Sequence, residues 1–167
     1  MYMLIKVRYP VHDLGKPVLV IASDVEGDAL NMLVLNKQKA DFKVCAVKAP
    51  GFGDKQVDVL SDVAAATGAT LIEGDLLYRD VGLSDFGRCR KVVSSAHKTT
   101  ILGARGNEQD IIRHIEGIES NMVAAETQYE QDYYRKRAAS LVNGLAVIKV
   151  GAHTEVELNE KKARLED

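Results

Sequence analysis

The first part of the chain alternates short β-branched runs with segments of helical periodicity. Residues 18–22 and 43–47 are largely apolar and predict two buried strands. Polar cap residues open a predicted helix at residues 28–39, and a second helix is expected at residues 56–66, ended by a C-cap at Gly68. Strands and helices in alternation favour an α/β fold in which the helices pack on a sheet.

The middle of the chain predicts further strands. Residues 70–72 and 90–94 carry β-branched runs, and residues 99–102 can pair with the second of these runs across a turn at residues 96–97. Residues 73–88 contain three glycines and are expected to be irregular. The sequence therefore predicts a strand pair that is separated from the first two strands by a long loop.

Two segments with apolar residues at helical spacing follow this strand pair. Their apolar residues are Ile111, Ile112, Ile115, Ile118 and Met122 in the first segment, and Tyr134, Ala138 and Leu141 in the second. The two segments predict a helical hairpin joined near residues 125–128. Asn143 and Gly144 are expected to end the second helix, and residues 145–150 predict a strand that returns toward the start of the domain.

Composition places the chain among ordinary globular proteins, with 46% hydrophobic, 28% charged and 5% aromatic residues in a length of 167. The formal net charge of -2 argues against a dedicated nucleic-acid surface. Short basic runs at residues 88–91 and 135–137 are predicted to be solvated. No apolar run approaches the length of a membrane span, so neither nucleic acid nor membrane is an expected partner.

The residues that could carry redox, metal or histidine chemistry are scattered. Cys45 and Cys89 have no second Cys or His at metal-ligand spacing and are expected to be reduced thiols in a reducing compartment. The four histidines are dispersed along the chain, which supports neither a metal site nor histidine catalysis. We therefore expect a soluble intracellular protein without a metal.

Two further patterns resemble functional sites without meeting their requirements. The glycines of residues 50–53 are not followed by the Gly-Lys-Ser/Thr of a phosphate-binding loop. Asp54, Asp58 and Asp62 share one helix face, for which a solvated surface is a more common outcome than a cation site. The residues by themselves predict no enzyme, and no ATP or other cofactor is expected to bind this chain.

Four segments combine an unusual composition with a defined order along the chain. They are residues 16–30, with the run Asp24-Val25-Glu26-Gly27-Asp28-Ala29-Leu30; residues 48–54, Lys-Ala-Pro-Gly-Phe-Gly-Asp; residues 144–151; and residues 155–167. In this order they resemble the group I chaperonins, the GroEL type. The similarity extends from residue 15 to residue 167.

The resemblance implies a fold and a domain organisation. It implies the layered β-sheet sandwich flanked by helices of a chaperonin apical domain, with a C-terminal helical hairpin and a returning strand. Residues 1–143 would be the apical, polypeptide-binding domain, incomplete at its N-terminus. Residues 144–167 would begin the intermediate domain, with a short strand at residues 155–158 and a charged helix after it that looks truncated. The family's ATP-binding equatorial domain has no counterpart in the sequence.

The helix expected at residues 28–39 has apolar side chains on two faces. The face that can pack on the sheet contains Ala29, Met32, Leu33, Asn36 and Ala40. Leu30, Val34 and Leu35 point substantially away from that face. A second covering layer would make these three residues part of the core, whereas an uncovered aliphatic stripe would mark a binding surface.

The resemblance favours the binding surface. In group I chaperonins the helix after Asp-Val-Glu-Gly binds non-native polypeptides and the mobile loop of the cochaperonin, and Leu30, Val34 and Leu35 match its binding positions. The preceding helix of the family forms the other wall of the groove. Residues 1–14 do not match that helix, so no binding residue is expected there.

The resemblance also implies features that operate only in the whole family protein. Asn143 and Gly144 match the hinge between apical and intermediate domains, and Asp167 matches the aspartate that acts in ATP hydrolysis. ATP, Mg²⁺ and heptameric rings belong to the full-length family, which assists ATP-dependent folding in the cytoplasm of bacteria or in mitochondria and plastids. The alternative function is a stand-alone α/β protein-interaction module that reuses the fold.

Overall fold

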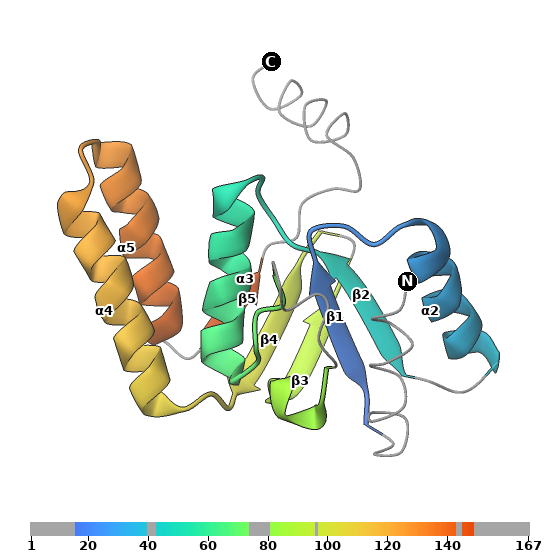
Figure 1. Ribbon diagram of the computed structural model, residues 1–167. Helices are drawn as coiled ribbons and strands as arrows, with labels where there is room; N and C mark the ends of the chain where they lie inside the picture. The colour runs from blue at the N-terminus through green and yellow to red at the C-terminus, as the bar shows by residue number, and fades with distance from the viewer. Residues whose placement is uncertain (1–15, 40–42, 74–80, 96, 143–144, 149–167) are drawn as a thin grey trace.

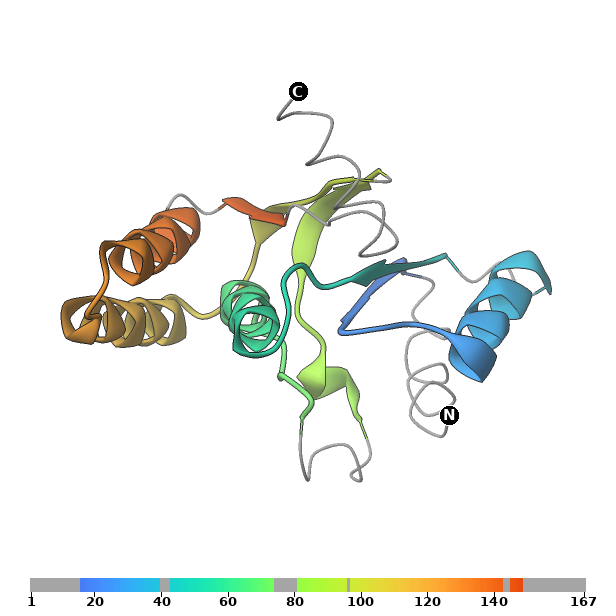
Figure 2. The ribbon, with the colours of Figure 1, turned by 90° about the horizontal axis from the view of Figure 1, so that it is seen from above.

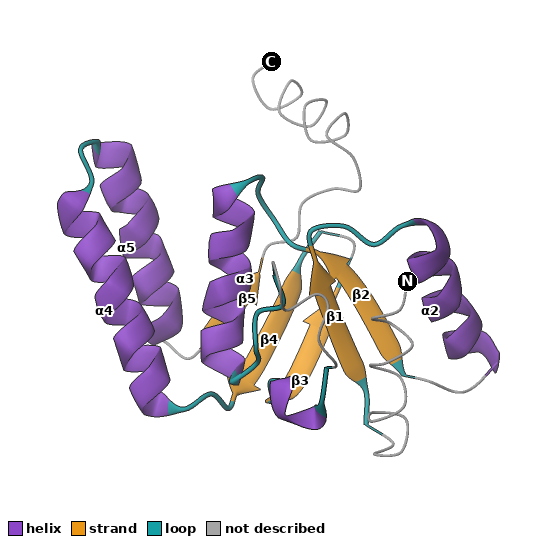
Figure 3. Cartoon of the chain, in the orientation of Figure 1, coloured by secondary structure: helices purple, strands orange, loops and turns teal. Residues whose placement is uncertain are grey.

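The computed structural model describes residues 16–39, 43–73, 81–95, 97–142 and 145–148 (Figure 1). The elements run in the order β1 (Val18–Ala22), α2 (Gly27–Lys39), β2 (Val44–Lys48), α3 (Asp54–Thr67), η2 (Leu83–Asp85), β3 (Cys89–Ser94), β4 (Thr99–Ala104), α4 (Glu108–Ala124), α5 (Gln128–Val142) and β5 (Leu145–Ile148). Figure 3 shows the strands between α2 on one side and the helices α3, α4 and α5 on the other. The structure confirms a mixed α/β fold.

Two small sheets form the described strand structure. Strands β1 and β2 are parallel, with Val18 opposite Val44 and Ala22 opposite Lys48, and α2 is the crossover between them. Strands β3, β4 and β5 form an antiparallel sheet in that order. The predicted pairing of residues 90–94 with residues 99–102 is confirmed, since Ser94 lies opposite Thr99.

The two sheets and α3 share one apolar core. Val47 from β2, Val63 from α3 and Ile101 from β4 are its buried members, and Ile101 is almost fully enclosed. Partly buried residues from β1, α3 and β3 pack against them: Leu19, Ile21, Val59, Cys89 and Val92. Figure 2 shows α3 and the β1–β2 pair on the same side of the β3–β4 hairpin, as this shared core requires.

The helical hairpin α4–α5 packs on α3 through a second apolar cluster. Ala66 of α3, Ile118 of α4 and Leu141 of α5 are buried together. Asn107 is the N-cap of α4, because its side-chain oxygen accepts hydrogen bonds from the backbone N–H groups of Gln109 and Asp110. The predicted hairpin, its short connection at residues 125–127 and the inward position of Ile118 are therefore confirmed.

Several predicted boundaries are corrected or lie outside the described residues. Residues 70–72 are not a strand, because the hydrogen bond from Thr70 N to Asp85 O joins them to the η2 turn rather than to a sheet. Ile112 faces outward and is about half exposed, although it shares the helical apolar pattern. Residues 149–150 of the predicted returning strand, and everything predicted after them, lie outside the described residues.

In the part of the chain that the structure describes, each helix is too short or too polar to cross a membrane.

Candidate functional site

Helix α2 divides its aliphatic side chains between the core and the surface. Leu33 is only 5% exposed and packs with Val44 of β2. Leu30, Val34 and Leu35 are 44%, 43% and 48% exposed. The division follows from the 100° advance per residue of an α-helix, which turns these three side chains away from the sheet that Leu33 covers.

The start of α2 is held by two loops that lie side by side. Asp24 accepts a hydrogen bond from Val25 N at 2.8 Å, and it forms an ion pair with Lys48 Nζ at 3.0 Å. The hydrogen bond from Lys48 holds the pKa of the Asp24 carboxyl below its usual value. The Asp-Val-Glu-Gly segment and the Lys48-to-Asp54 segment, which are distant in sequence, therefore meet at the base of α2.

Backbone hydrogen bonds add to this junction. Ala49 N donates to Ala22 O at 2.8 Å, which continues the β1–β2 pairing past the strand ends. Gln56, in the first turn of α3, donates from its side-chain amide to Ala49 O at 2.9 Å. These contacts fix where α2 and α3 leave the parallel strand pair, so the exposed side of α2 has a defined orientation.

The stripe Leu30, Val34 and Leu35 has the chemistry of an apolar contact surface. The three side chains have methyl groups and no hydrogen-bonding atoms. They can therefore bind a partner by burial of apolar area, but they cannot recognise its polar side chains through hydrogen bonds. We refer to these three residues as the α2 stripe. What the structure establishes is their common exposure on one helix, and their binding role stays a prediction.

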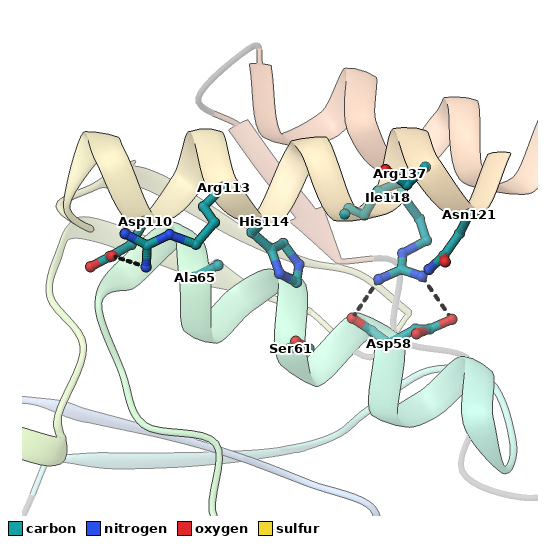
Figure 4. A pocket seen from close by; sticks show the side chains of 11 residues that line it. Asp58, Ser61, Ala65, Asp110, Arg113, His114, Ile118, Asn121 and Arg137 are labelled. Atoms are coloured by element: carbon teal, nitrogen blue, oxygen red, sulfur yellow. Dashed lines mark hydrogen bonds and ion pairs between the residues drawn. The ribbon is translucent and has the colours of Figure 1, made fainter. Parts of the chain in front are cut away.

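A polar network lies between α3 and the α4–α5 hairpin, next to a surface pocket of about 630 Å³ (Figure 4). Arg137 of α5 is 9% exposed, pairs with Asp62 through Nη2 at 2.9 Å and reaches Asp58 through Nη1 at 2.8 Å. His114 Nε2 of α4 lies 2.8 Å from Asp62 Oδ1. Tyr133 OH donates to Asp58 at 3.0 Å. The network thus connects three helices.

The electrostatics of the network follow from burial and from these partners. Burial alone would lower the pKa of Arg137, but the hydrogen bond and charge of Asp62 outweigh it, so the pKa rises. Burial raises the pKa of Tyr133 well above its usual value, and the Asp58 carboxylate raises it further. Both carboxylates are occupied by protein donors, so the network links the three helices.

The network corrects two predictions from the sequence. Asp58 and Asp62 are not on a solvated face, because both bind Arg137, and Arg137 itself is buried although it belongs to a basic run predicted to be solvated. The helical pattern contained a signal: Arg137 lies three residues after Tyr134 and four before Leu141, on the packed face of α5. A charge at such a position predicts a buried partner.

The other candidate residues are placed as follows. Asn143, Gly144 and Asp167 lie outside the described residues. Cys45 and Cys89 are free thiols in the structure, and burial raises the pKa of Cys89. Over the described ranges, no group of three or more histidine, cysteine or acidic side chains is arranged to hold a metal ion. A comparison of the chain with models of known protein families gives no match.

Proposed function

We propose that this chain is an apical-domain-like part of a group I chaperonin and binds non-native polypeptides through the α2 stripe. The observation that carries the proposal is the exposure of Leu30, Val34 and Leu35, each between 43% and 48%, on the helix that follows the Asp-Val-Glu-Gly segment. Exposed aliphatic side chains grouped within six residues of one helix can bind another apolar surface.

The energetics favour a weak and unselective contact. Fully burying an aliphatic side chain contributes roughly 1.5 to 3 kcal/mol, so covering the exposed half of three such side chains contributes roughly 2 to 4 kcal/mol. Association itself costs about 4 kcal/mol or more. One stripe alone is therefore a low-affinity site, and several stripes acting on one client would gain affinity through multivalency. A ring of subunits supplies that multivalency.

The remaining parts of the proposal rest on the four motifs. Residues 1–143 are assigned to the polypeptide-binding apical domain of layered sheets and helices, and residues 144–167 to the start of the intermediate domain. In the whole ring, the same stripe would take the mobile loop of the cochaperonin, and ATP with Mg²⁺ would act through a domain that this sequence does not contain. The compartment would be the bacterial cytoplasm, the mitochondrion or the plastid.

The test compares serine substitutions at two valines with equal exposure. Val34→Ser changes the α2 stripe, and Val57→Ser changes a valine on α3 that is also 43% exposed. Surface substitutions usually shift stability by no more than about 0.5 kcal/mol, so both variants should fold. Light scattering during dilution of a chemically denatured client measures how much of the client is captured. Capture is expected to fall with Val34→Ser and to stay unchanged with Val57→Ser.

Three results would count against the proposal. Equal client capture by both variants would show that the stripe has no special role. Unfolding of Val34→Ser at moderate urea, where Val57→Ser stays folded, would assign Val34 to the core. Binding of one folded partner, with no capture of denatured clients, would identify a stand-alone protein-interaction module instead.

A further inference from the structure

The β3–β4 hairpin concentrates positive charge in a chain whose net charge is negative. Residues 88–105 contain five lysines and arginines, one histidine and neither aspartate nor glutamate, whereas the whole chain has 22 basic and 24 acidic residues. The basic members are Arg88, Arg90, Lys91, His97, Lys98 and Arg105, and all of them are exposed. Within the described residues, none of these side chains forms an ion pair.

Three of the arginines gather at one end of the hairpin. Arg105 N donates to Arg88 O at 2.9 Å, so these two residues lie opposite one another just beyond the ends of β3 and β4. Arg90 lies two residues further along β3 and is also exposed. Its side chain runs beside Gly103, since a Cβ added at Gly103 would lie 3.4 Å from Arg90 Nε.

The backbone at Gly103 makes this arrangement possible. Cys89 and Val92 both pack on the shared core, a spacing of three that a regular strand with alternating side chains does not allow. Gly103 has a φ of 63°, a conformation that favours glycine, and it lies across from the irregular stretch of β3. Cys89 and Ala104, the neighbours of Arg88 and Arg105, pack on apolar clusters that include α3, so the alternation of strand side chains turns Arg88 and Arg105 to the opposite face of the hairpin. Arg90 is exposed as well.

Unpaired like charges at this position reduce stability. Like charges that face one another across a strand pair are destabilising, and no acidic side chain of the described residues relieves the repulsion between Arg88 and Arg105. An external anion would relieve it. Arginine matches carboxylates in particular, because its planar fork of donors can bind both oxygens of one carboxylate.

We propose that Arg88, Arg90 and Arg105 form a binding site for a short acidic polypeptide segment. The outward face continues from the arginines through Lys91 to Val93, which is about half exposed, so an apolar position follows the cationic ones. A segment that has aspartate or glutamate residues beside aliphatic residues fits this arrangement. The site is separate from the α2 stripe and does not depend on the function proposed for that stripe.

Nucleic acid fits the same surface less well. Residues 88–105 contain no phenylalanine, tyrosine or tryptophan on which unpaired bases could stack. The net charge of -2 repels a long polyanion at distance, whereas a short acidic segment interacts mainly within the Debye length of about 8 to 10 Å around the arginines.

The first experiment measures peptide binding by fluorescence anisotropy. The probe is a labelled peptide of alternating glutamate and valine, and its neutral counterpart has glutamine in place of glutamate. The variant Arg88→Gln/Arg90→Gln/Arg105→Gln is compared with Arg113→Gln/Arg135→Gln/Lys136→Gln, which makes the same change in net charge on the α4–α5 hairpin. Circular dichroism and thermal unfolding establish that both variants fold.

The site predicts a specific set of results. The arginine variant should bind the glutamate peptide at least about tenfold more weakly than the unsubstituted protein, and the control variant should lose less than about twofold. The unsubstituted protein should bind the neutral peptide at least about tenfold more weakly than the glutamate peptide. Its binding of the glutamate peptide should weaken as salt is added. An equal loss in the two variants would overturn the proposal, as would tighter binding of oligo(dT) than of the peptide.

A second experiment tests the repulsion itself. Arg88→Gln should raise the thermal unfolding midpoint at low ionic strength, and the increase should disappear in about 1 M salt, where the Debye length is about 3 Å. Adding the glutamate peptide should raise the midpoint of the unsubstituted protein more than that of Arg88→Gln. A midpoint lowered by Arg88→Gln at low salt would overturn the proposal, because Arg88 would then be stabilised by the protein itself.

Discussion

Arg137 binds Asp62 through two parallel hydrogen bonds, from Nε to Oδ2 and from Nη2 to Oδ1, each 2.9 Å long. The two residues are 75 positions apart in the sequence and belong to α5 and α3. His114 of α4 adds a contact of 2.8 Å to the same carboxylate. One aspartate of α3 therefore contacts both helices of the α4–α5 hairpin.

Removal of this aspartate should destabilise the fold strongly. Asp62→Ala leaves the guanidinium of Arg137 buried with one of its two carboxylate partners, and breaking a buried pair in this way costs about 3 kcal/mol. Urea unfolding followed by circular dichroism measures the change. The control is Asp132→Ala, which removes the exposed ion pair with Arg135 on α5 and should cost no more than about 0.5 kcal/mol. Equal midpoints for the two variants would show that the network contributes little.

Two tyrosines on α5 should change the free energy of unfolding in opposite directions at alkaline pH. Unfolded tyrosine loses its proton near pH 10. The pKa of Tyr133 is raised by burial and by Asp58, so above about pH 10 the unfolded state binds fewer protons and stability falls as pH rises. The pKa of Tyr129 is lowered by the hydrogen bond from Lys55, so its contribution to stability increases as pH approaches 10 from below.

Substitution by phenylalanine separates these two contributions. Tyr133→Phe should make the decline of the unfolding free energy above about pH 10 less steep, while Tyr129→Phe should remove a small gain just below that pH. The measurement is urea unfolding at a series of pH values from neutral to alkaline. Parallel pH profiles for the two variants would contradict the opposite pKa shifts.

Alanine substitution at two glycines should change the stability of the protein in opposite directions. At Gly106 an added Cβ would lie 2.3 Å from Ala65 O, because Gly106 packs against the end of α3. Gly106→Ala is therefore expected to destabilise the protein by about 2 kcal/mol or more. At Gly117, inside α4, an added Cβ meets nothing within 4 Å, and Gly117→Ala should stabilise by about 0.5 to 1 kcal/mol. Thermal unfolding of both variants checks the two signs.

The features predictable from the sequence were those set by local periodicity and turn chemistry. The strands β1 to β4, the hairpin α4–α5 and the opposite orientations of Leu33 and Leu35 all follow from spacing within one segment. Gly68 ends α3 with a φ of 75°, as expected for a helix C-cap.

The features that were missed depend on contacts between distant segments. The spacing of Asp58 and Asp62 on α3 gives no information about which helix covers them, so their burial against Arg137 could not be read from α3 alone. Residues 70–72 have the composition of a strand but lie beside η2, where no strand of the described residues pairs with them. The arginine cluster needed the strand register, because only the pairing of β3 with β4 brings Arg105 opposite Arg88.

The central claim, that the α2 stripe binds non-native polypeptide, is tested most directly by methyl NMR. Protein labelled at leucine and valine methyl groups is titrated with an unfolded client peptide. The methyl signals of Leu30, Val34 and Leu35 should shift with a common binding curve, while those of buried Leu33 and of equally exposed Val57 should shift much less. Shifts at Val57 with none at the stripe would contradict the claim.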